Sequence, residues 1–357
     1  MDFRYGDHAG QRTRAGRRAR FLTLLAMAAV TAGSLVGSAS GNAPLRVCPT
    51  CTYTTIPAAL TAAAAQSGQD LIQIAPGTYS GDPEDITITS DVTLQGAGTG
   101  QTTLASVVVV EGVTTKIAGV MIDAFGQHVG VQNAGTLTLK SSLLTGNLAC
   151  SIWNRTPGSA TVRDSTVTGG RYWGTGICND GTLALKGSTV TDNYTDGAGG
   201  GIFNTGTLTV RDSTISGNTA GSWSHGGGGI YNGAGATLII SNSAISQNEA
   251  YFYGVGGGIC NFGAITVSDS TVDGNYARYQ GGGIYNGAAG SATAKNTVVT
   301  RNWVSTEPFP QVPGGGGIYN SGALTLLGVT VTGNSGPDPG LLNEGGTLTI
   351  KDSTIQP

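Results

Sequence analysis

Four residues are the candidates in this chain for acid–base chemistry. They are Asp196, His225, Glu249 and Arg278, and each lies in a connection between two repeats of the sequence. A carboxylate working with a second acid, a histidine or an arginine can donate and remove protons while a sugar polymer is cleaved. Spacing alone does not bring the four side chains together. Cleavage of a polysaccharide by these residues is therefore an alternative function.

Aromatic residues are concentrated in the same connections. Eleven of the 20 aromatic residues that follow residue 42 lie there. The candidate ligand-binding residues among them are Tyr172, Trp173, Trp223, Tyr251, Tyr253, Tyr276, Tyr279 and Trp303. Flat rings beside scattered hydrogen-bonding charges suit a sugar chain, whose C–H groups stack on aromatic faces. Two interpretations remain open: a binding face for a glycan or cell-surface partner, or rings that only pack on one another to order glycine-rich loops.

A repeated phrase of strand-forming residues positions these connections. It starts with a GIYN-like segment, continues through LTV-like and STV-like segments, and ends at a second Asn. The first Asn of the strong copies is Asn179, Asn204, Asn232, Asn261, Asn286 or Asn320. Copies follow each other every 21 to 34 residues, a period typical of a solenoid. Apolar and polar residues alternate within short runs, which predicts strands rather than helices.

Stacking such repeats has two consequences. At about 4.8 Å per turn, columns of Val, Ile and Leu are buried, and identical Asn side chains form ladders of hydrogen bonds. We therefore interpret the repeated Asn residues as structural rather than catalytic. Since every connection leaves the same corner of the coil, the connections project from one side, where repeat proteins commonly bind their partners.

Composition excludes several classes of protein. The 357 residues include 60 Gly, only 11% are charged and 39% are hydrophobic. That hydrophobic content is too high for a disordered chain, and the glycines follow no collagen period. A net charge of −3 argues against a nucleic-acid partner.

The repeats resemble those of a known superfamily. The segments GGGIYN at 281–286, LTV at 208–210 and DSTISGN at 212–218 resemble the right-handed parallel β-helix repeats of pectin-lyase-like proteins, including the polymorphic outer-membrane protein repeat. Residues 53–79 resemble the N-terminal cap of that superfamily. The resemblance implies an all-β, right-handed parallel β-helix with a short N-terminal capping helix. It also implies an extracellular or cell-surface location, and many members cut or bind polysaccharides.

The resemblance also implies what an enzyme of this kind needs. A β-helix lyase holds Ca²⁺ with clustered carboxylates beside an Arg or Lys base, and a hydrolase brings two or three Asp together. The acids that recur here before Ser-Thr are Asp164, Asp212, Asp269 and Asp352. Asn or Gly replaces them on intervening coils, so most lie about 10 Å apart and cannot share one ion. We interpret them as turn residues. We expect no metal and no cofactor, with Ca²⁺ needed only by a lyase.

The five cysteines fit an oxidising compartment. Cys48 and Cys51 are close enough in sequence for a local disulfide. Cys178 and Cys260 occupy the same slot three coils apart, beyond the ~7 Å limit on the Cα separation of a disulfide. We interpret both as packing thiols. A bridge from Cys150 to Cys178 requires a distorted coil before Trp153.

The first 42 residues are predicted to be a signal peptide. An Arg-rich start is followed by the apolar run 21–37 and then by small residues. This order is typical of secretory leaders, and the run is short for a membrane anchor. The predicted parts are the signal peptide 1–42, the cap and first coils 43–100, and the β-helix repeats 101–357. We expect a secreted or cell-surface protein without a membrane span after signal cleavage.

These observations favour a non-catalytic β-helix protein that binds a glycan or a surface partner through its aromatic connections. A polysaccharide lyase or glycoside hydrolase is the alternative. A minor alternative is an ice-binding solenoid, because outward Thr pairs such as Thr166 and Thr168 recur on several coils. Ala244, Asp273 and Val298 interrupt that array.

Overall fold

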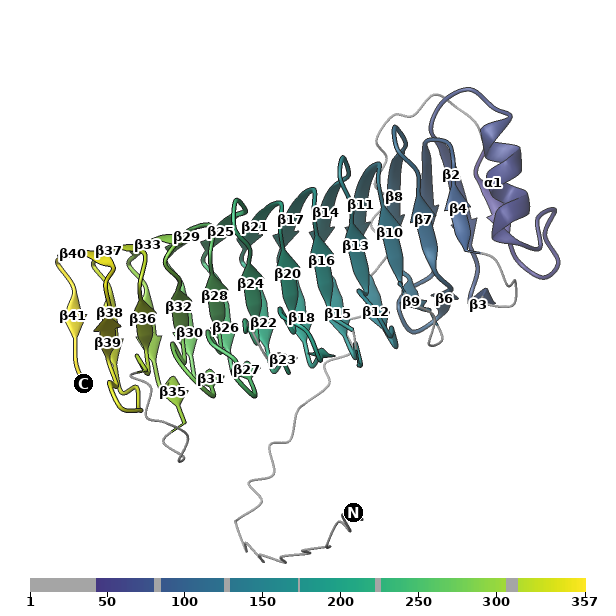
Figure 1. The fold of residues 1–357 in the computed structure, drawn as a ribbon. Helices are drawn as coiled ribbons and strands as arrows, with labels where there is room; N and C mark the ends of the chain where they lie inside the picture. The colour runs from purple at the N-terminus through teal and green to yellow at the C-terminus, as the bar shows by residue number, and fades with distance from the viewer. Residues whose placement is uncertain (1–42, 80–84, 125–128, 173, 222–225, 306–313) are drawn as a thin grey trace, which may run out of the picture. The chain divides into compact units, whose positions relative to one another are not determined.

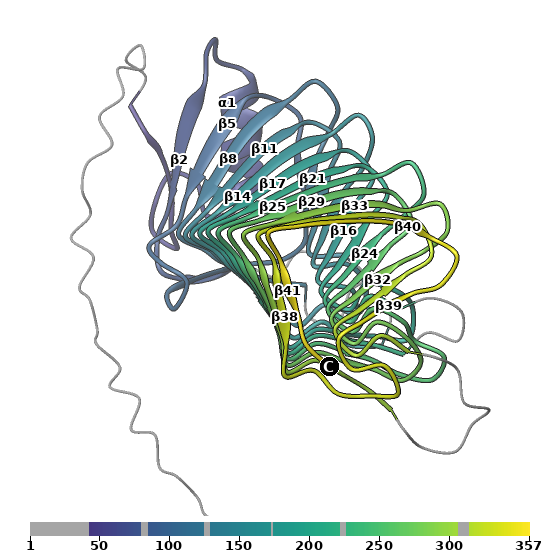
Figure 2. The same ribbon diagram turned by 90° about the vertical axis from the view of Figure 1, so that its left-hand side faces the viewer.

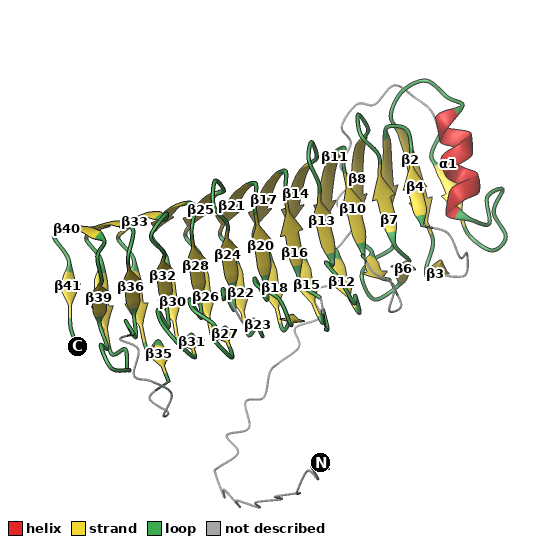
Figure 3. Cartoon of the chain, viewed as in Figure 1, coloured by secondary structure: helices red, strands yellow, loops and turns green. Residues whose placement is uncertain are grey.

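The structure is a computed structural model that describes residues 43–79, 85–124, 129–172, 174–221, 226–305 and 314–357. All of these residues belong to one structural unit, Ser40–Pro357. The predicted signal peptide, Trp173, Trp223 and His225 lie outside the described residues. The unit is the predicted all-β, right-handed parallel β-helix with one short helix near its start, so the predicted fold class is confirmed (Figure 1, Figure 3).

Each coil contributes one strand to each of three long parallel sheets, here called A, B and C. In the described residues sheet A has 13 strands. They are β1 (Leu45–Val47), β2 (Asp70–Ile74), β5 (Val92–Gln95), β8 (Thr114–Ala118), β11 (Thr136–Lys140), β14 (Ser159–Arg163), β17 (Thr182–Lys186), β21 (Thr207–Arg211), β25 (Thr237–Ser241), β29 (Ala264–Ser268), β33 (Ser291–Lys295), β37 (Ala323–Leu327) and β40 (Thr347–Lys351).

Sheet B follows sheet A around the coil. Its strands are β3 (Gly77–Tyr79), β6 (Thr102–Leu104), β9 (Met121–Asp123), β12 (Leu143–Thr145), β15 (Thr166–Thr168), β18 (Thr189–Thr191), β22 (Thr214–Ser216), β26 (Ala244–Ser246), β30 (Thr271–Asp273), β34 (Val298–Thr300), β38 (Thr330–Thr332) and β41 (Thr354–Ile355).

Sheet C closes the coil before the chain returns to sheet A. Its strands are β4 (Ile86–Ile88), β7 (Val107–Val109), β10 (Val131–Asn133), β13 (Ile152–Asn154), β16 (Ile177–Asn179), β20 (Ile202–Asn204), β24 (Ile230–Asn232), β28 (Ile259–Asn261), β32 (Ile284–Asn286), β36 (Ile318–Asn320) and β39 (Leu341–Asn343).

A fourth, short sheet lies between sheets B and C around the coil. Sheet D consists of β19 (Tyr194–Thr195), β23 (Thr219–Ala220), β27 (Glu249–Ala250), β31 (Tyr276–Ala277) and β35 (Trp303–Val304). Seen from the end of the coils, sheet A and the connections that include sheet D lie on opposite sides of the cross-section (Figure 2).

The helix α1 (Ile56–Ala64) covers the first coils. Thr55 caps its N-terminus, because the Thr55 Oγ1 accepts a hydrogen bond of 3.4 Å from the backbone N–H of Ala58. Its buried side chains include Ile56, Ala59 and Leu60, and the helix contacts β1, β2 and β4. The cap thus follows the prediction made from residues 53–79.

Strict alternation builds the core. In β21 the side chains of Leu208 and Val210 are fully buried, and Ile215 of β22 is buried on the same coil. Equivalent residues on successive strands are partners in register, for example Leu208 with Leu238 and Val210 with Ile240. Columns of aliphatic side chains therefore fill the interior from one coil to the next.

Two ladders of Asn side chains hold neighbouring coils together. In the first, the six predicted Asn residues lie in one line, in which each Nδ2 donates to the Oδ1 of the next at 2.7–2.8 Å. The second ladder runs through Asn193, Asn218, Asn248, Asn275, Asn302 and Asn334 at 2.8–2.9 Å. All of these side chains are buried, and their amides are satisfied by the equivalent Asn residues and by backbone groups of turns and neighbouring strands.

The corner between sheets A and B explains the acids before Ser-Thr. The residue there has a positive φ on coil after coil, 50° at Asp164, 52° at Asp212 and 47° at Asn242. Only Gly adopts this region without strain, and Asp and Asn tolerate it better than other residues. The backbone conformation therefore selects Asp, Asn or Gly at this slot, and the recurring carboxylates need no catalytic role.

We predict that Asn204→Ala lowers the stability of the protein by about 2–3 kcal/mol, because Asn179 and Asn232 then lose a buried hydrogen-bond partner. Urea unfolding followed by circular dichroism measures the effect as a lower midpoint. The matched control is Thr209→Ala on the outward face of the same coil, with an expected change within about 0.5 kcal/mol. Equal shifts in the two variants would contradict a structural ladder.

We also predict that Ser141→Gly raises stability by about 0.5–1 kcal/mol, because Ser141 occupies the corner slot with φ 47°. The neighbouring change Ser142→Gly removes a buried hydroxyl that donates to the carbonyl of Lys140 and lowers stability. Thermal unfolding of both variants checks the opposite signs. If Ser141→Gly instead lowered the stability of the protein, the positive φ at residue 141 would not be a source of strain for Ser141.

Candidate functional site

The connections begin as strands rather than as loops. After each Asn of the second ladder, two residues pair with the equivalent residues of the next coil, as Tyr276 and Ala277 pair with Trp303 and Val304. The ladder fixes the backbone just before these residues, so parallel pairing continues for two more positions. The first side chain of each pair therefore points outward at a fixed place, and the second points into the core.

In the part of the chain that the structure describes, the most exposed aromatic side chains all lie on this side. They are Tyr172, Tyr194, Tyr251, Phe252, Tyr253 and Trp303, with exposed fractions between 41% and 64%. The remaining large hydrophobic residues with comparable exposure are aliphatic: Ile239, Val298 and Ile350. The connections thus form one aromatic surface, here called the connection face.

Several of these rings touch one another. The ring centroids of Tyr251 and Tyr276 lie 5.7 Å apart, and those of Tyr276 and Trp303 lie 4.0 Å apart. Tyr253 and Tyr279 form a second pair at 5.8 Å. Tyr276 is only 7% exposed, so it supports Tyr251 and Trp303 rather than offering a free face to a ligand. Packing between rings therefore accounts for the position of Tyr276, and the binding interpretation concerns only the exposed rings.

The candidate acids of the connection face are engaged by tyrosines. The hydroxyl of Tyr194 donates to Asp196 Oδ1 at 2.7 Å, and this hydrogen bond raises the pKa of Tyr194. A hydrogen bond to Glu249, together with burial, raises the pKa of Tyr251 to about 12. Both tyrosines are therefore neutral donors at ordinary pH. Each of the two carboxylates thus accepts a hydrogen bond from a neighbouring tyrosine hydroxyl.

Three of the four candidate catalytic residues, Asp196, Glu249 and Arg278, are among the described residues, and they lie on three different coils. Asp196 and Glu249 follow or occupy strands β19 and β27, which are two steps apart in sheet D and so separated by about 10 Å. Arg278 lies on the coil after Glu249, with its backbone N–H bonded to the carbonyl of Ala250 at 2.9 Å. His225, the remaining candidate, is outside the described residues. Among the described residues no group of three or more His, Cys, Asp or Glu side chains could hold a metal ion.

The cysteines form two disulfides. One joins Cys48 to Cys51 at the start of the described chain. The other joins Cys150 to Cys178, with a Cα–Cα distance of 5.8 Å. Cys260 is the remaining cysteine, a buried free thiol. The interpretation of Cys178 as a packing thiol is therefore wrong, whereas that of Cys260 agrees with the structure.

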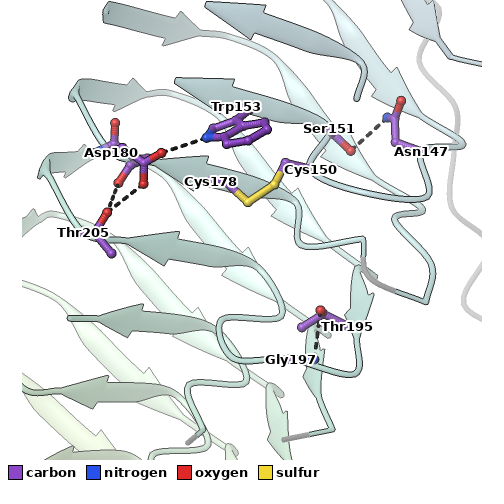
Figure 4. Close-up of a disulfide and its surroundings, with 10 residues drawn as sticks. Asn147, Cys150, Ser151, Trp153, Cys178, Asp180, Thr195, Gly197 and Thr205 are labelled. Atoms are coloured by element: carbon purple, nitrogen blue, oxygen red, sulfur yellow. Dashed lines mark hydrogen bonds between the residues drawn. A yellow bond between two sulfur atoms is a disulfide. The ribbon is translucent and has the colours of Figure 1, made fainter. Parts of the chain in front are cut away.

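The geometry of the turn before β13 explains the Cys150–Cys178 bridge. Trp153 and Cys178 are register partners on neighbouring strands, and Cys150 precedes Trp153 by three residues. In this turn Cys150 lies beside Cys178 of the next coil, with the indole of Trp153 next to the bridge (Figure 4). The column pattern compared Cys178 only with equivalent residues of other coils, so from sequence the bridge to Cys150 was considered only under the condition of a distorted coil.

A second aromatic row lies on the outward face of sheet C. Its ring centroids are separated by 5.0 Å for Phe203–Tyr231, 5.9 Å for Tyr231–Phe262, 5.8 Å for Phe262–Tyr285 and 5.0 Å for Tyr285–Tyr319. Phe262 bridges the gap where Cys260 replaces an aromatic residue. The signal in the sequence is an aromatic residue directly after Asn261, where the other five of the six predicted ladder Asn residues are followed by Gly, Thr, Ser or Asp.

One acid outside the connections also has defined partners. Asp180 accepts hydrogen bonds from the Trp153 indole at 2.8 Å and from the Thr205 hydroxyl at 2.7 Å (Figure 4). The guanidinium carbon of Arg155 lies 4.8 Å from the Trp153 ring centre. These contacts fix the indole at the end of the aromatic row, beside the disulfide.

The outward Thr pairs lie in register on sheet B, but their array is short. Thr166, Thr189 and Thr214 are successive partners, followed by Ala244. Further along, an exposed ion pair between Arg301 and Asp273 crosses the same face. The geometry adds nothing that favours the ice-binding alternative.

A comparison with protein families assigns the fold family. The family described as "right handed beta helix region" matches residues 106–299, more than half of the chain. The chain belongs to this right-handed β-helix family. No curated protein sequence matches this β-helix protein.

Solved structures with the same fold are only distantly similar to this β-helix protein. The Agl-KA catalytic domain is 14% identical with a TM-score of 0.53, over 82% of this chain and 64% of that chain. The A-module of the Azotobacter vinelandii mannuronan C-5 epimerase AlgE6 is 16% identical with a TM-score of 0.48, over 85% and 94%. Pectate lyase Pel9A is 13% identical with a TM-score of 0.42, over 88% and 80%. At these identities the likeness concerns the fold alone.

Among the helices of the described residues, none is long and apolar enough to cross a bilayer.

We predict that thiol titration distinguishes the disulfide assignment from the packing-thiol interpretation. Burial raises the pKa of Cys260 to about 12, and the side chain is fully buried, so no thiol of the native β-helix protein reacts with Ellman's reagent. Denaturation without a reductant is expected to release one reactive thiol per chain. Three reactive thiols would contradict the Cys150–Cys178 bridge.

Proposed function

We propose that this chain is an exported β-helix protein that binds a polysaccharide, free or on a cell surface, through its connection face and without cleaving it. The observation that carries the proposal is that, among the described residues, the most exposed aromatic rings all lie in the connections. An exposed aromatic surface of this kind is unusual on a soluble protein and marks a site of interaction.

The arrangement of the rings suits a linear sugar polymer. From Tyr172 to Trp303 the exposed rings span six successive coils and lie on four of them, a length of about 24 Å at the inter-strand spacing. The contacts of Tyr276 with Tyr251 and Trp303 hold these two exposed rings in place before a ligand arrives. Such pre-ordering reduces the entropy cost of binding.

Hydrogen-bonding groups lie among the rings. Asp196 and Glu249 each bond the hydroxyl of a tyrosine on the same strand or directly after it. A carboxylate so placed can accept a hydrogen bond from a sugar hydroxyl beside a ring that stacks on the sugar. This use of the two acids supports binding rather than the alternative, a lyase or hydrolase that uses Asp196, His225, Glu249 and Arg278.

Export is part of the proposal. The first 42 residues have the order of a secretory leader. The two disulfides support an oxidising destination, because such bonds are rare in reducing compartments.

The proposal predicts that the purified protein is retarded during electrophoresis through a gel that contains its polysaccharide. The panel consists of hydroxyethylcellulose, xylan, dextran and a polyuronate. For a polymer that retards the protein, Tyr251→Ala with Trp303→Ala is expected to weaken binding about tenfold or more, since each stacked ring contributes about 1 kcal/mol. Circular dichroism checks that the variant is folded.

The control removes exposed hydrophobic area elsewhere. Ile239→Ala with Val298→Ala changes side chains that are 42% and 38% exposed on sheets A and B, and retardation should persist. The proposal fails if no polymer retards the protein or if both double variants lose binding equally. Release of new sugar ends, abolished by Glu249→Gln, would support the enzymatic alternative instead.

A further inference from the structure

The outward face of sheet A is strongly basic. Of the twelve Lys and Arg residues that follow residue 42, eight lie at outward positions of sheet A strands. They are Arg46, Lys116, Lys140, Arg163, Lys186, Arg211, Lys295 and Lys351. The one acid within these strands, Asp70, is buried. This face is therefore cationic on a chain whose net charge is negative.

Four of the cations form an unbroken column. Lys140, Arg163, Lys186 and Arg211 are register partners on β11, β14, β17 and β21. Their backbones span about 14 Å at the inter-strand spacing. Lys116 of β8 lies on the preceding coil, in the neighbouring outward column, as the partner of Thr138.

This column has no compensating ion pair. Like charges directly opposite each other on neighbouring strands are destabilising. In the part of the chain that the structure describes, the only salt bridge is between Arg301 and Asp273. A cost in stability that is repeated on four coils and left uncompensated indicates a role in binding an external anion.

The nearest acids do not neutralise the column. Asp164 and Asp212 directly follow Arg163 and Arg211 at the corner to sheet B. Asp212 Oδ1 accepts a hydrogen bond of 2.6 Å from Asn242 on the next coil. The Asp164 carboxylate lies beside Gly187 of its next coil, where an added Cβ would be 2.8 Å from Oδ1. Both carboxylates are thus directed along the corner, toward the next coil.

The surroundings of the column define the kind of anion. The other outward residues of these four strands are small, and most carry hydroxyls: Thr136, Thr138, Ser159, Thr161, Thr182, Ala184, Thr207 and Thr209. Proteins that bind single-stranded nucleic acids use aromatic stacking platforms, and amphipathic surfaces that enter membranes use large apolar residues. These strands present neither outward. A narrow line of cations flanked by hydroxyls instead matches a linear chain of charged sugars.

We propose that this basic column is a second binding site, for a linear polysaccharide that carries carboxylate or sulfate groups along its length. The polymer lies along the stack of coils, so that successive anionic groups meet successive cations. The site is on the opposite side of the coil from the connection face and does not depend on the function proposed for that face (Figure 2).

The test compares dextran sulfate with neutral dextran in gels at low ionic strength, because the two probes differ only in their charged groups. Binding at the basic column should retard the protein in gels that contain dextran sulfate. Neutral dextran has no charged groups, so it should not bind at this column. Arg163→Glu with Lys186→Glu should weaken retardation about tenfold or more, as two of four contacts change sign. Raising the salt from about 50 to 200 mM should weaken the binding of the unchanged protein.

The matched control also reverses two charges of this column of sheet A. These two residues lie outside the four consecutive cations. Lys295→Glu with Lys351→Glu gives the same net charge and should retain most of the retardation. Tyr251→Ala with Trp303→Ala should retain all of it, which separates this site from the connection face. Equal losses in the two charge-reversal variants would show attraction by net charge alone and would overturn the proposal.

The remaining outcomes concern the identity of the anion. Single-stranded DNA and vesicles of anionic phospholipid are tested as competitors of dextran sulfate at equal charge concentration. The polysaccharide should win in both comparisons. Failure of dextran sulfate to retard the unchanged protein, or stronger binding of DNA or vesicles to the same column, would also overturn the proposal.

Discussion

The register between neighbouring coils is the constraint on which the rest of this structure depends. Each strand pairs in parallel with the equivalent strand of the next coil, so equivalent residues lie about 4.8 Å apart along the stack. Any residue type that recurs in the sequence therefore becomes a column in space. Asn is suited to the buried corners because its amide both donates and accepts, so one residue can satisfy the next without water.

Glycine at the end of each connection follows from the same constraint. A Cβ at Gly229 would lie 2.6 Å from the carbonyl of Gly258 on the next coil and 3.0 Å from the side chain of Asn248. Gly201 has the same surroundings one coil earlier, beside Gly229 and Asn218. The last glycine before each sheet C strand thus allows the chain to return past the second Asn ladder into sheet C. The start of each connection is fixed by the second Asn ladder and its end by this glycine. The number of residues between these two points can therefore vary from coil to coil.

The parts of the fold that repeat were predictable from sequence, and the parts that depend on a single turn were not. The Asn spacing predicted strands, coils and the ladder from Asn179 to Asn320, because one coil determines the next. The Cys150–Cys178 bridge joins residues that are not equivalent, so no column pattern could indicate it. The burial of Tyr276 depends on contacts with rings of two neighbouring coils, which composition does not reveal.

The basic column illustrates a different limit. Each of its members stands before the corner to the next sheet, so its recurrence was visible in the sequence. Its meaning required knowledge that these side chains face outward and that Asp164 and Asp212, which follow Arg163 and Arg211, are directed along the corner instead. Net charge alone, which is negative, concealed a cationic face. In the fold, the basic side chains face outward from sheet A, whereas the carboxylates of Asp164 and Asp212 that follow two of them are directed along the corner.

The central claim is that the connection face contacts the polysaccharide. Hydroxyl-radical footprinting with mass spectrometry, on the unchanged protein with and without each polymer of the gel panel, tests it most directly. Binding should protect Tyr194, Tyr251, Phe252, Tyr253 and Trp303 from oxidation, while Ile239 and Val298, which are exposed on other faces, react as before. The proposed binding face would be contradicted if a polymer that retards the protein left the oxidation of the five rings unchanged. It would also be contradicted if protection were confined to residues outside the connections.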